Sequence, residues 1–500
     1  GAAGRLCRRR CGRIARSVDA ARAVVEADPA KPDTGKLPSD PFGTLEVRDG
    51  RVIGIVNGKD TDVITSLNGQ AKWPALNSDA SVSATGIWHG ESVGVDLSVS
   101  APLLLFAGGT SGLSVTFKSA PATFSFEGNA SLAQNAFFDG QAKFAAPSLR
   151  RVLQWLGTSP TPSGTIGAVS LVSKVTGETG RIKFSGTELT MNKNPGVGAL
   201  ELSFTDALPV VAGTLAFETL DLRAFLSAFT PMASTSGHVP DQIDANFADW
   251  FNLDLRLSAT QAAAGAVQLG NVAATAQVKN GLAVFDISDA AAFGGNIQSS
   301  LRFDRKPEGT QVEMRLLASD INGAQFGEAA GMKRLVPTGT GSVSIILKGP
   351  GKSWDTVMDN ANGSISANFG KGTLTGLNLP SFVKRCQEGG FFPLDEVADG
   401  TLPIDRAVLK ASISNGVARI EQAEAHSAKD RIWVSGIVPY AGGGLALSGG
   451  IGPAATAAPA NGQQADTQPR QDEDQVAFFV GGTWTTPFIS PINRLPAAGN

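Results

Sequence analysis

The sequence predicts a mostly β protein, a long, curved and twisted antiparallel sheet that forms an open apolar groove, with a few short amphipathic helices. The first observation is that apolar and polar residues alternate along many segments, which is the period of an extended strand. The second is that glycine, 59 of the 500 residues, and asparagine separate these segments as turns do. The third is that each strand has one apolar face, and one-sided strands are typical of antiparallel sheets.

The strands can be followed along the chain from position 41 onward. In the segment FNLDLRLSA at 251–259, four apolar residues alternate with Asn, Asp, Arg and Ser, and segments at 113–118, 200–205 and 343–348 follow the same rule. Alternate side chains on a strand share one face, although a β-bulge reverses the face. We therefore expect the groove to be lined by apolar residues at alternate positions, including Val95, Leu97, Val115, Phe117, Leu202, Phe204, Leu253, Leu255, Val343 and Ile345.

Helices are predicted where the apolar spacing changes to three and four. In 147–157, Ser148 is a candidate N-cap, and Leu149, Val152, Leu153 and Leu156 share one face. We expect such short helices to cover or plug the apolar sheet face, at 147–157, 220–231, 322–335, 353–363 and 379–386. The apolar run APLLLFA at 101–107 is too short to span a bilayer.

Composition divides the chain into four parts. Residues 1–40 are rich in arginine and small residues, and we expect a disordered basic leader that reflects a truncated or misassigned start. The groove region is expected at 41–452. Residues 453–475 lack periodicity and predict a flexible polar insertion. Residues 476–500 predict a final strand and a tail.

Several classes of function are disfavoured by composition. The net charge of −3 provides no basic surface for nucleic acid. The three histidines His89, His238 and His426 lie far apart in sequence, and we expect no metal and no cofactor. Cys7, Cys11 and Cys386 form no even set and are expected to be free thiols.

One segment resembles the nucleophile motif of serine hydrolases. Gly90-Glu91-Ser92-Val93-Gly94 fits G-x-S-x-G, but that motif needs a helix after the serine. Alternation after Gly94 predicts a strand instead. We therefore expect no enzyme and no catalytic residue, and keep an esterase that uses Ser92 as an alternative.

Longer stretches together resemble the AsmA family of Gram-negative envelope proteins, in the alphaproteobacterial style. The resemblance covers roughly residues 42–496, and its parts are moderately specific one by one and highly specific together. They are LNGQAKWPALNSDASVSATGIWHGESVGVDLSVSAPLLLFAG, PSLRRVLQWLG, GTLAFETLDL, FGGNIQSSLRFD, GTGSVSIILKGPGKSWDTVMDNANGSISANFGKGTLTGLNL and FFVGGTWTTPFISP.

The resemblance implies a protein anchored in the inner membrane that faces the periplasm. It also implies a role in outer-membrane biogenesis, with phospholipid carried along a β-groove and a link to outer-membrane protein assembly and the targeting of proteins to the membrane. The family's N-terminal transmembrane helix is not seen at the start of this sequence. The expected partners are phospholipid or another acyl lipid, membranes and envelope or outer-membrane assembly proteins. A β-rich envelope protein whose apolar face is simply packed core is the structural alternative.

Overall fold

The computed structural model describes residues 16–56, 59–132, 136–156, 167–191, 194–227, 243, 245–249, 251–439, 443–454 and 476–492. Contacts between residues divide the chain into two compact units. Unit 1 comprises residues 1–220, 227–229 and 249–256. Unit 2 comprises residues 221–226, 230–248 and 257–500.

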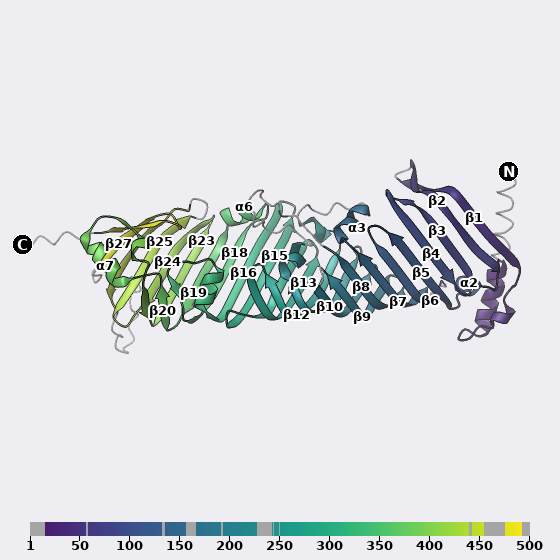
Figure 1. Ribbon diagram of the computed structural model, residues 1–500, viewed down its shortest axis with the longest axis horizontal. Coiled ribbons are helices and arrows are strands. Elements are labelled where there is room, and N and C mark those ends of the chain that lie inside the picture. Colours follow the sequence, from purple (N-terminus) through teal and green to yellow (C-terminus); the bar gives the residue numbers. More distant parts are fainter. Residues whose placement is uncertain are drawn as a thin grey trace, which may run out of the picture. The chain divides into compact units, whose positions relative to one another are not determined.

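Hydrogen bonding joins 25 of the described strands in one sheet and three in another. The strands of unit 1 run antiparallel, each beside its neighbour in sequence (Figure 1). They are β1 (Pro41–Val56), β2 (Lys59–Ala75), β3 (Ala80–Trp88), β4 (Glu91–Val99), β5 (Ser111–Ser119), β6 (Thr123–Ser131), β7 (Phe137–Ala146), β8 (Val169–Glu178), β9 (Arg181–Met191), β10 (Asn194–Ser203) and β11 (Val210–Asp221), whose last residue belongs to unit 2.

Two short helices lie at opposite ends of these strands (Figure 1). α2 (Pro102–Ala107) begins with a proline and ends at Gly108, which has a positive φ of 94°. α3 (Leu149–Trp155) is capped by the Ser148 side chain, as the sequence predicts. α2 was not expected, because its run of apolar residues shows no helical periodicity.

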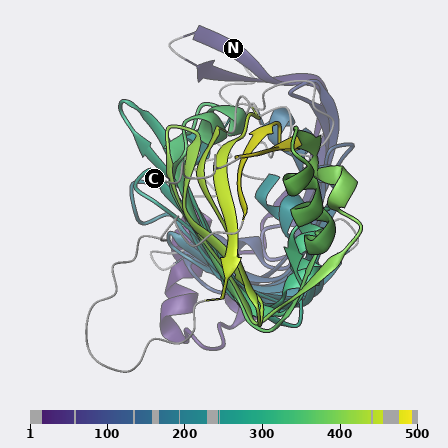
Figure 2. The ribbon, with the colours of Figure 1, turned by 90° about the vertical axis from the view of Figure 1, so that its left-hand side faces the viewer.

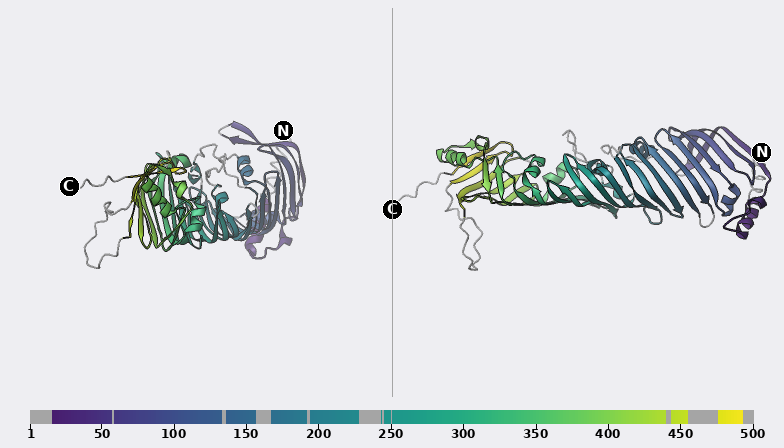
Figure 3. Two further views of the ribbon diagram at one scale, coloured as in Figure 1. Left: turned by 60° about the vertical axis from the view of Figure 1, so that its left-hand side comes forward. Right: turned by 60° about the horizontal axis from the view of Figure 1, so that its bottom comes forward.

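The N-terminal segment corrects one expectation. Residues 16–27 are helical, and η1 (Thr34–Lys36) follows them (Figure 3). Ala21 and Leu37 are buried in a cluster with Leu76, Leu103 and Leu104. The disordered leader predicted for 1–40 is therefore replaced by packed structure from residue 16, because a small apolar helix face docks on α2. Residues 1–15 lie outside the described residues.

Unit 2 contains a second antiparallel series. β16 pairs with β18, and β19 pairs with β23. Between β19 and β23, residues 370–405 form an excursion from the large sheet that contributes to it only the short strand β21. The strands are β12 (Asn252–Ala264, begun in unit 1), β13 (Val267–Lys279), β14 (Leu282–Ala292), β15 (Gly295–Lys306), β16 (Gly309–Asn322), β18 (Thr340–Pro350), β19 (Asn362–Phe369), β21 (Phe392–Pro393), β23 (Arg406–Ser414), β24 (Val417–His426), β25 (Asp430–Pro439), β26 (Ala446–Pro453), β27 (Val476–Gly482) and β28 (Pro487–Pro491). The smaller sheet consists of β17 (Val336–Pro337), β20 (Gly372–Thr375) and β22 (Thr401–Ile404).

The predicted helices of unit 2 are present. Three of them are shorter than predicted, because each is a single amphipathic turn or two between strands, whereas the helix predicted at 379–386 continues to Glu388. They are α4 (Leu222–Ser227, whose last residue belongs to unit 1), α5 (Gly323–Ala329), α6 (Trp354–Asp359) and α7 (Leu379–Glu388); the 3-10 turns are η2 (Asn246–Asp249) and η3 (Leu394–Val397). α7 lies beside the hairpin of β27 and β28, with the ring of Phe382 5.0 Å from that of Phe478 (Figure 2).

The mostly β fold class is confirmed, with an open antiparallel sheet and few short helices. The predicted final strand at 476–491 is instead two strands, because Thr483–Thr486 form a tight turn. The predicted flexible insertion falls almost entirely on 455–475, outside the described residues, as does the tail from 493. No helix in the described ranges has both the length and the apolarity needed to cross a membrane.

Candidate functional site

An apolar face runs across the strands of unit 1. Leu97 on β4 lies opposite Val115 on β5, which lies opposite Phe126 on β6, which lies opposite Ala142 on β7. Side chains directly opposite each other in an antiparallel pair point to the same side of the sheet. We call this side of the sheet the unit 1 inner face.

A second row of apolar residues lies parallel to the first on the same face. Val95 is opposite Phe117, Phe117 is opposite Phe124, and Phe124 is opposite Phe144. Four of the predicted lining residues, Val95, Leu97, Val115 and Phe117, are therefore brought together as two cross-strand pairs. Phe124 keeps 39% of its surface exposed, so this part of the face is open.

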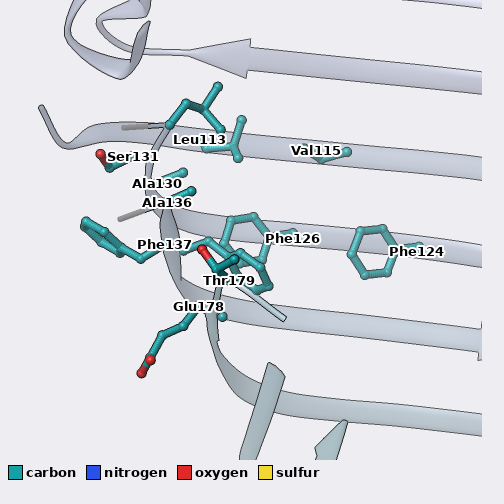
Figure 4. Close-up of a pocket in the computed structure, with 13 residues that line it drawn as sticks. Leu113, Val115, Phe124, Phe126, Ala130, Ser131, Ala136, Phe137, Glu178 and Thr179 are labelled. Carbon is teal, nitrogen blue, oxygen red and sulfur yellow. The ribbon is translucent and has the colours of Figure 1, made fainter. Parts of the chain in front are cut away.

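A cavity of about 360 Å³ lies on this face at the ends of β6 and β8. Its walls are almost wholly apolar, and Figure 4 shows the Glu178 carboxylate pointing away from the rings of Phe124 and Phe126. Its lining residues are Leu113, Val115, Phe124, Phe126, Ala130, Ser131, Leu132, Ala136, Phe137, Phe138, Gly177, Glu178 and Thr179.

Glycine at one position shapes the cavity. Phe138 on β7 is opposite Gly177 on β8, and a Cβ at Gly177 would meet the Phe138 ring at 2.1 Å. The ring therefore lies flat across the space that a side chain at 177 would fill. Phe126 meets Phe138 edge to face, with centroids 5.7 Å apart, which fixes the wall of the cavity.

α2 closes one end of the inner face. Leu105 is buried against Val99 and Ala130, with Leu97 and Leu113 packed around them. The backbone of α2 is joined to the residue that follows β6, since Leu132 N–H donates to the Leu105 carbonyl at 3.2 Å. α2 therefore covers the unit 1 inner face at this end of the strands and limits its exposed part.

α3 closes the other end. Val152 is buried with Ala122 and Ala146, and Phe144 packs against them. Trp155 meets Trp88 edge to face at 4.6 Å, and its ring lies 6.1 Å from that of Phe117. Between α2 and α3 the inner face is a trough with apolar walls.

Polar contacts hold α3 on the turn between β3 and β4. Trp155 Nε1 donates to the Trp88 carbonyl at 3.0 Å, and His89 Nδ1 lies 2.8 Å from the Trp155 carbonyl oxygen. Arg151 forms an ion pair with Glu91 at 2.8 Å. The turn itself depends on positive φ values at His89 and Gly90, which is typical of two-residue hairpins.

This turn accounts for the hydrolase-like motif. Ser92 is exposed on β4, opposite Ile87, and the chain continues as a strand to Val99. A nucleophile elbow needs a helix at that point. Here the motif residues Gly90 and Glu91 instead shape the turn and bind α3.

The other residues of unit 1 that were predicted to line the groove do not all lie on the unit 1 inner face. Leu202 lies between Ile182 and Val211, and Ile182 packs on the cavity cluster, so Leu202 belongs to the inner face. Phe204 lies beyond the end of β10 and is 53% exposed, so the alternation that placed it on the groove ends one residue earlier. Leu253 and Leu255 are buried on one side of β12, and Asp254 and Arg256, which alternate with them, are exposed.

In unit 2 the corresponding apolar face is packed core. Val343 on β18 is buried, and Ile345 packs against a cluster formed with α7. Cys386 on α7 lies in this cluster, and its burial raises the pKa of the thiol to about 11. Of these two predicted lining residues, Val343 is buried and Ile345 is half-buried against the cluster. Cys7, Cys11 and His238 lie outside the described residues.

Sequence reasoning missed the residues that build the cavity. Phe124 and Phe126 lie in a segment predicted as a strand, and their alternation could have placed them. Phe138 and Gly177 could not be found, because their contact depends on the register of β7 and β8. Trp155 was predicted on a helix, but its contact with Trp88 spans 67 residues of sequence.

The chemistry of this trough is that of an apolar surface. The side chains on its floor carry no charge, and the carboxylate of Glu178 points away from it. A model of the AsmA family matches residues 167–423, just over half of the chain. The chain belongs to the AsmA family.

Family membership places the protein among membrane-associated proteins of envelope biogenesis. The match covers β8 to β11 of the unit 1 sheet and the strands of unit 2 up to part of β24. No curated protein and no solved structure matches the chain.

Proposed function

We propose that this AsmA-family protein shields or conducts acyl lipid, in the first instance phospholipid, along the unit 1 inner face. The observation that supports the proposal is the open row of apolar side chains between α2 and α3, which leads to the cavity under Phe138. A folded protein that exposes a contiguous apolar surface commonly uses it to bind a ligand or partner. The protein has no chemistry of its own in this proposal.

The energetics favour such a role. Each methylene that leaves water gains about 0.8 kcal/mol, so a lipid with roughly thirty methylenes resists transfer into water by about 24 kcal/mol. An apolar trough lowers that barrier because the chains remain against side chains such as Val115 and Phe124. The headgroup can stay in solvent at the open side.

We also propose that the protein is anchored in the inner membrane, works on its periplasmic side, and influences assembly of outer-membrane proteins. The support for these points is the family membership alone. Membranes and outer-membrane assembly proteins are the corresponding partners. Lipid carriage is distinguished from an effect on protein assembly by mass spectrometry of the lipids that co-purify with the protein.

The structural alternative has its own support. The apolar face in unit 2 is buried under α7, with Phe392 fully inaccessible. If the trough of unit 1 were equally closed by a partner protein, the whole molecule would be a scaffold. Mass spectrometry of lipids that co-purify with the full chain separates the two functions, because a scaffold retains no acyl lipid.

A pair of substitutions sharpens this test. Val115→Asp places a charge on the floor of the trough, where desolvation is costly, and should remove most of the bound lipid. Ser125→Asp is the matched control, because Ser125 is on the opposite face of the neighbouring strand and is paired with Lys143. Circular dichroism should show both variants folded. Equal lipid content in the two variants contradicts the proposal.

A further inference from the structure

The last three strands of unit 2 form a run of neighbouring strands without charged residues. β26, β27, β28 and the turn between the last two contain no Asp, Glu, Lys or Arg, over residues 446–453 and 476–492. The outer face of β15, β16 and β18 is different, since Arg302, Glu313 and Lys348 lie there together around a polar depression. A solvated sheet face usually has such charges.

Aromatic side chains occupy the charge-free surface. Phe488 lies opposite Gly481 on the neighbouring strand, and a Cβ at Gly481 would be 3.6 Å from the Phe479 ring. Phe479 and Phe488 therefore lie on the same, outer side of the hairpin, and Phe391 meets Phe488 edge to face with ring centroids 6.4 Å apart. Phe391 is 78% exposed.

A tryptophan extends this surface at the end of the hairpin. Trp484 lies in the turn between β27 and β28 and is 70% exposed. We call Phe391, Phe479, Trp484 and Phe488 the aromatic patch. All four side chains are exposed, and the core ring Phe478 is buried on the other side of β27.

The threonine hydroxyls of the turn have hydrogen-bond partners within it. Thr483 Oγ1 lies 2.7 Å from Thr486 Oγ1 and 3.1 Å from Thr485 Oγ1, and Thr486 N–H donates to Thr483 Oγ1 at 3.2 Å. Hydroxyl and amide groups that already have partners lose little when they leave water. The turn can therefore enter a poorly hydrated layer together with Trp484.

We propose that the aromatic patch docks this end of unit 2 on the interfacial layer of a lipid bilayer. The inference rests on the proposed function, because a protein that carries lipid must meet a membrane. Tryptophan and phenylalanine anchor proteins at the level of the headgroups, where an indole keeps a polar N–H near water and buries its ring. Because the strands that hold Phe479 and Phe488 contain no charged residue, we expect the contact to be with the apolar layer of the membrane and not with anionic headgroups.

The test is flotation of the purified full chain with vesicles of phosphatidylcholine alone and of phosphatidylcholine with one fifth phosphatidylglycerol. The protein should float with both, and added salt should not release it, because the contact is not ionic. The triple variant Phe479→Ser, Trp484→Ser, Phe488→Ser should bind more than about tenfold less, since each ring removes a large apolar area from water.

The control replaces three other exposed apolar residues, Ile53→Ser, Phe106→Ser and Met332→Ser, and should float like the unchanged protein. Brominated phosphatidylcholine should quench tryptophan fluorescence, and Trp484→Phe should remove most of that quenching. Both triple variants should retain their circular dichroism spectrum.

Three results overturn the inference: no flotation of the unchanged protein, equal flotation of the patch variant, or conversion of a dimer into a monomer by the patch variant in light scattering. The last result would assign the patch to a contact between copies. Lipid content is measured in the same preparations. Retained acyl lipid without flotation overturns the docking inference alone, and flotation without retained lipid overturns the proposed function alone.

Discussion

Phe138 lies across Gly177 so closely that a Cβ at 177 would be 2.1 Å from the ring. The two residues are paired on β7 and β8, and both line the cavity of unit 1. The position of the ring therefore depends on the absence of a side chain on the next strand. A single substitution can test whether the shape of the cavity matters for lipid binding.

Gly177→Val should displace the Phe138 ring into the cavity. Added volume in a packed site typically costs about 1–3 kcal/mol, so the melting temperature should fall while the fold persists. Binding of a fluorescent fatty acid should weaken. Gly94→Val is the matched control, because a Cβ at Gly94 has no neighbour nearer than 3.9 Å and that variant should bind normally. Equal binding by both variants would show that the cavity is not used.

α3 should detach from the turn between β3 and β4 when its tryptophan is removed. Trp155→Ala deletes the edge-to-face contact with Trp88 and the hydrogen bond to its carbonyl, so hydrogen exchange over residues 149–155 should accelerate. Arg151→Ala removes only a largely exposed ion pair, which is typically worth about 0–1 kcal/mol, and should change exchange little. Similar exchange in the two variants would mean that the aromatic contact does not hold α3.

The sequence predicts the strands and most of the short helices because their periodicity is local. Ser148 as a helix cap and the alternation of Val95, Leu97 and Val115 depend only on neighbours in sequence. Local spacing does not show which apolar face stays open. In unit 2 this is decided by α7 and the other residues of 370–405, and in unit 1 by α2 and α3. The helical residues 16–27 were missed because their buried Ala21 is too small to stand out in an arginine-rich segment.

The contrast between the open face of unit 1 and the packed face of unit 2 predicts different costs for the same substitution. Phe303 is fully buried on β15 between Ala283 and Val312, so Phe303→Ala should reduce the free energy of unfolding by about 3–5 kcal/mol. Phe124→Ala should cost less than half as much, because Phe124 already touches solvent. Urea denaturation measures both, and equal costs would mean that the trough is packed core.

The thiol of Cys386 should be chemically silent in the folded protein. In a Cys7→Ser, Cys11→Ser background, its reaction with a disulfide reagent at pH 8 should be slow and should become fast in urea, because the reagent needs both access and thiolate. Burial raises its pKa to about 11 from an ordinary value of 9.0, so the folded state holds the proton more tightly than the unfolded chain. The resulting stability is fully present below pH 9 and is lost as the pH rises through about 11. Cys386→Ala should remove this part of the pH dependence, whereas rapid modification of the folded protein at pH 8 would show that α7 does not stay docked on the core.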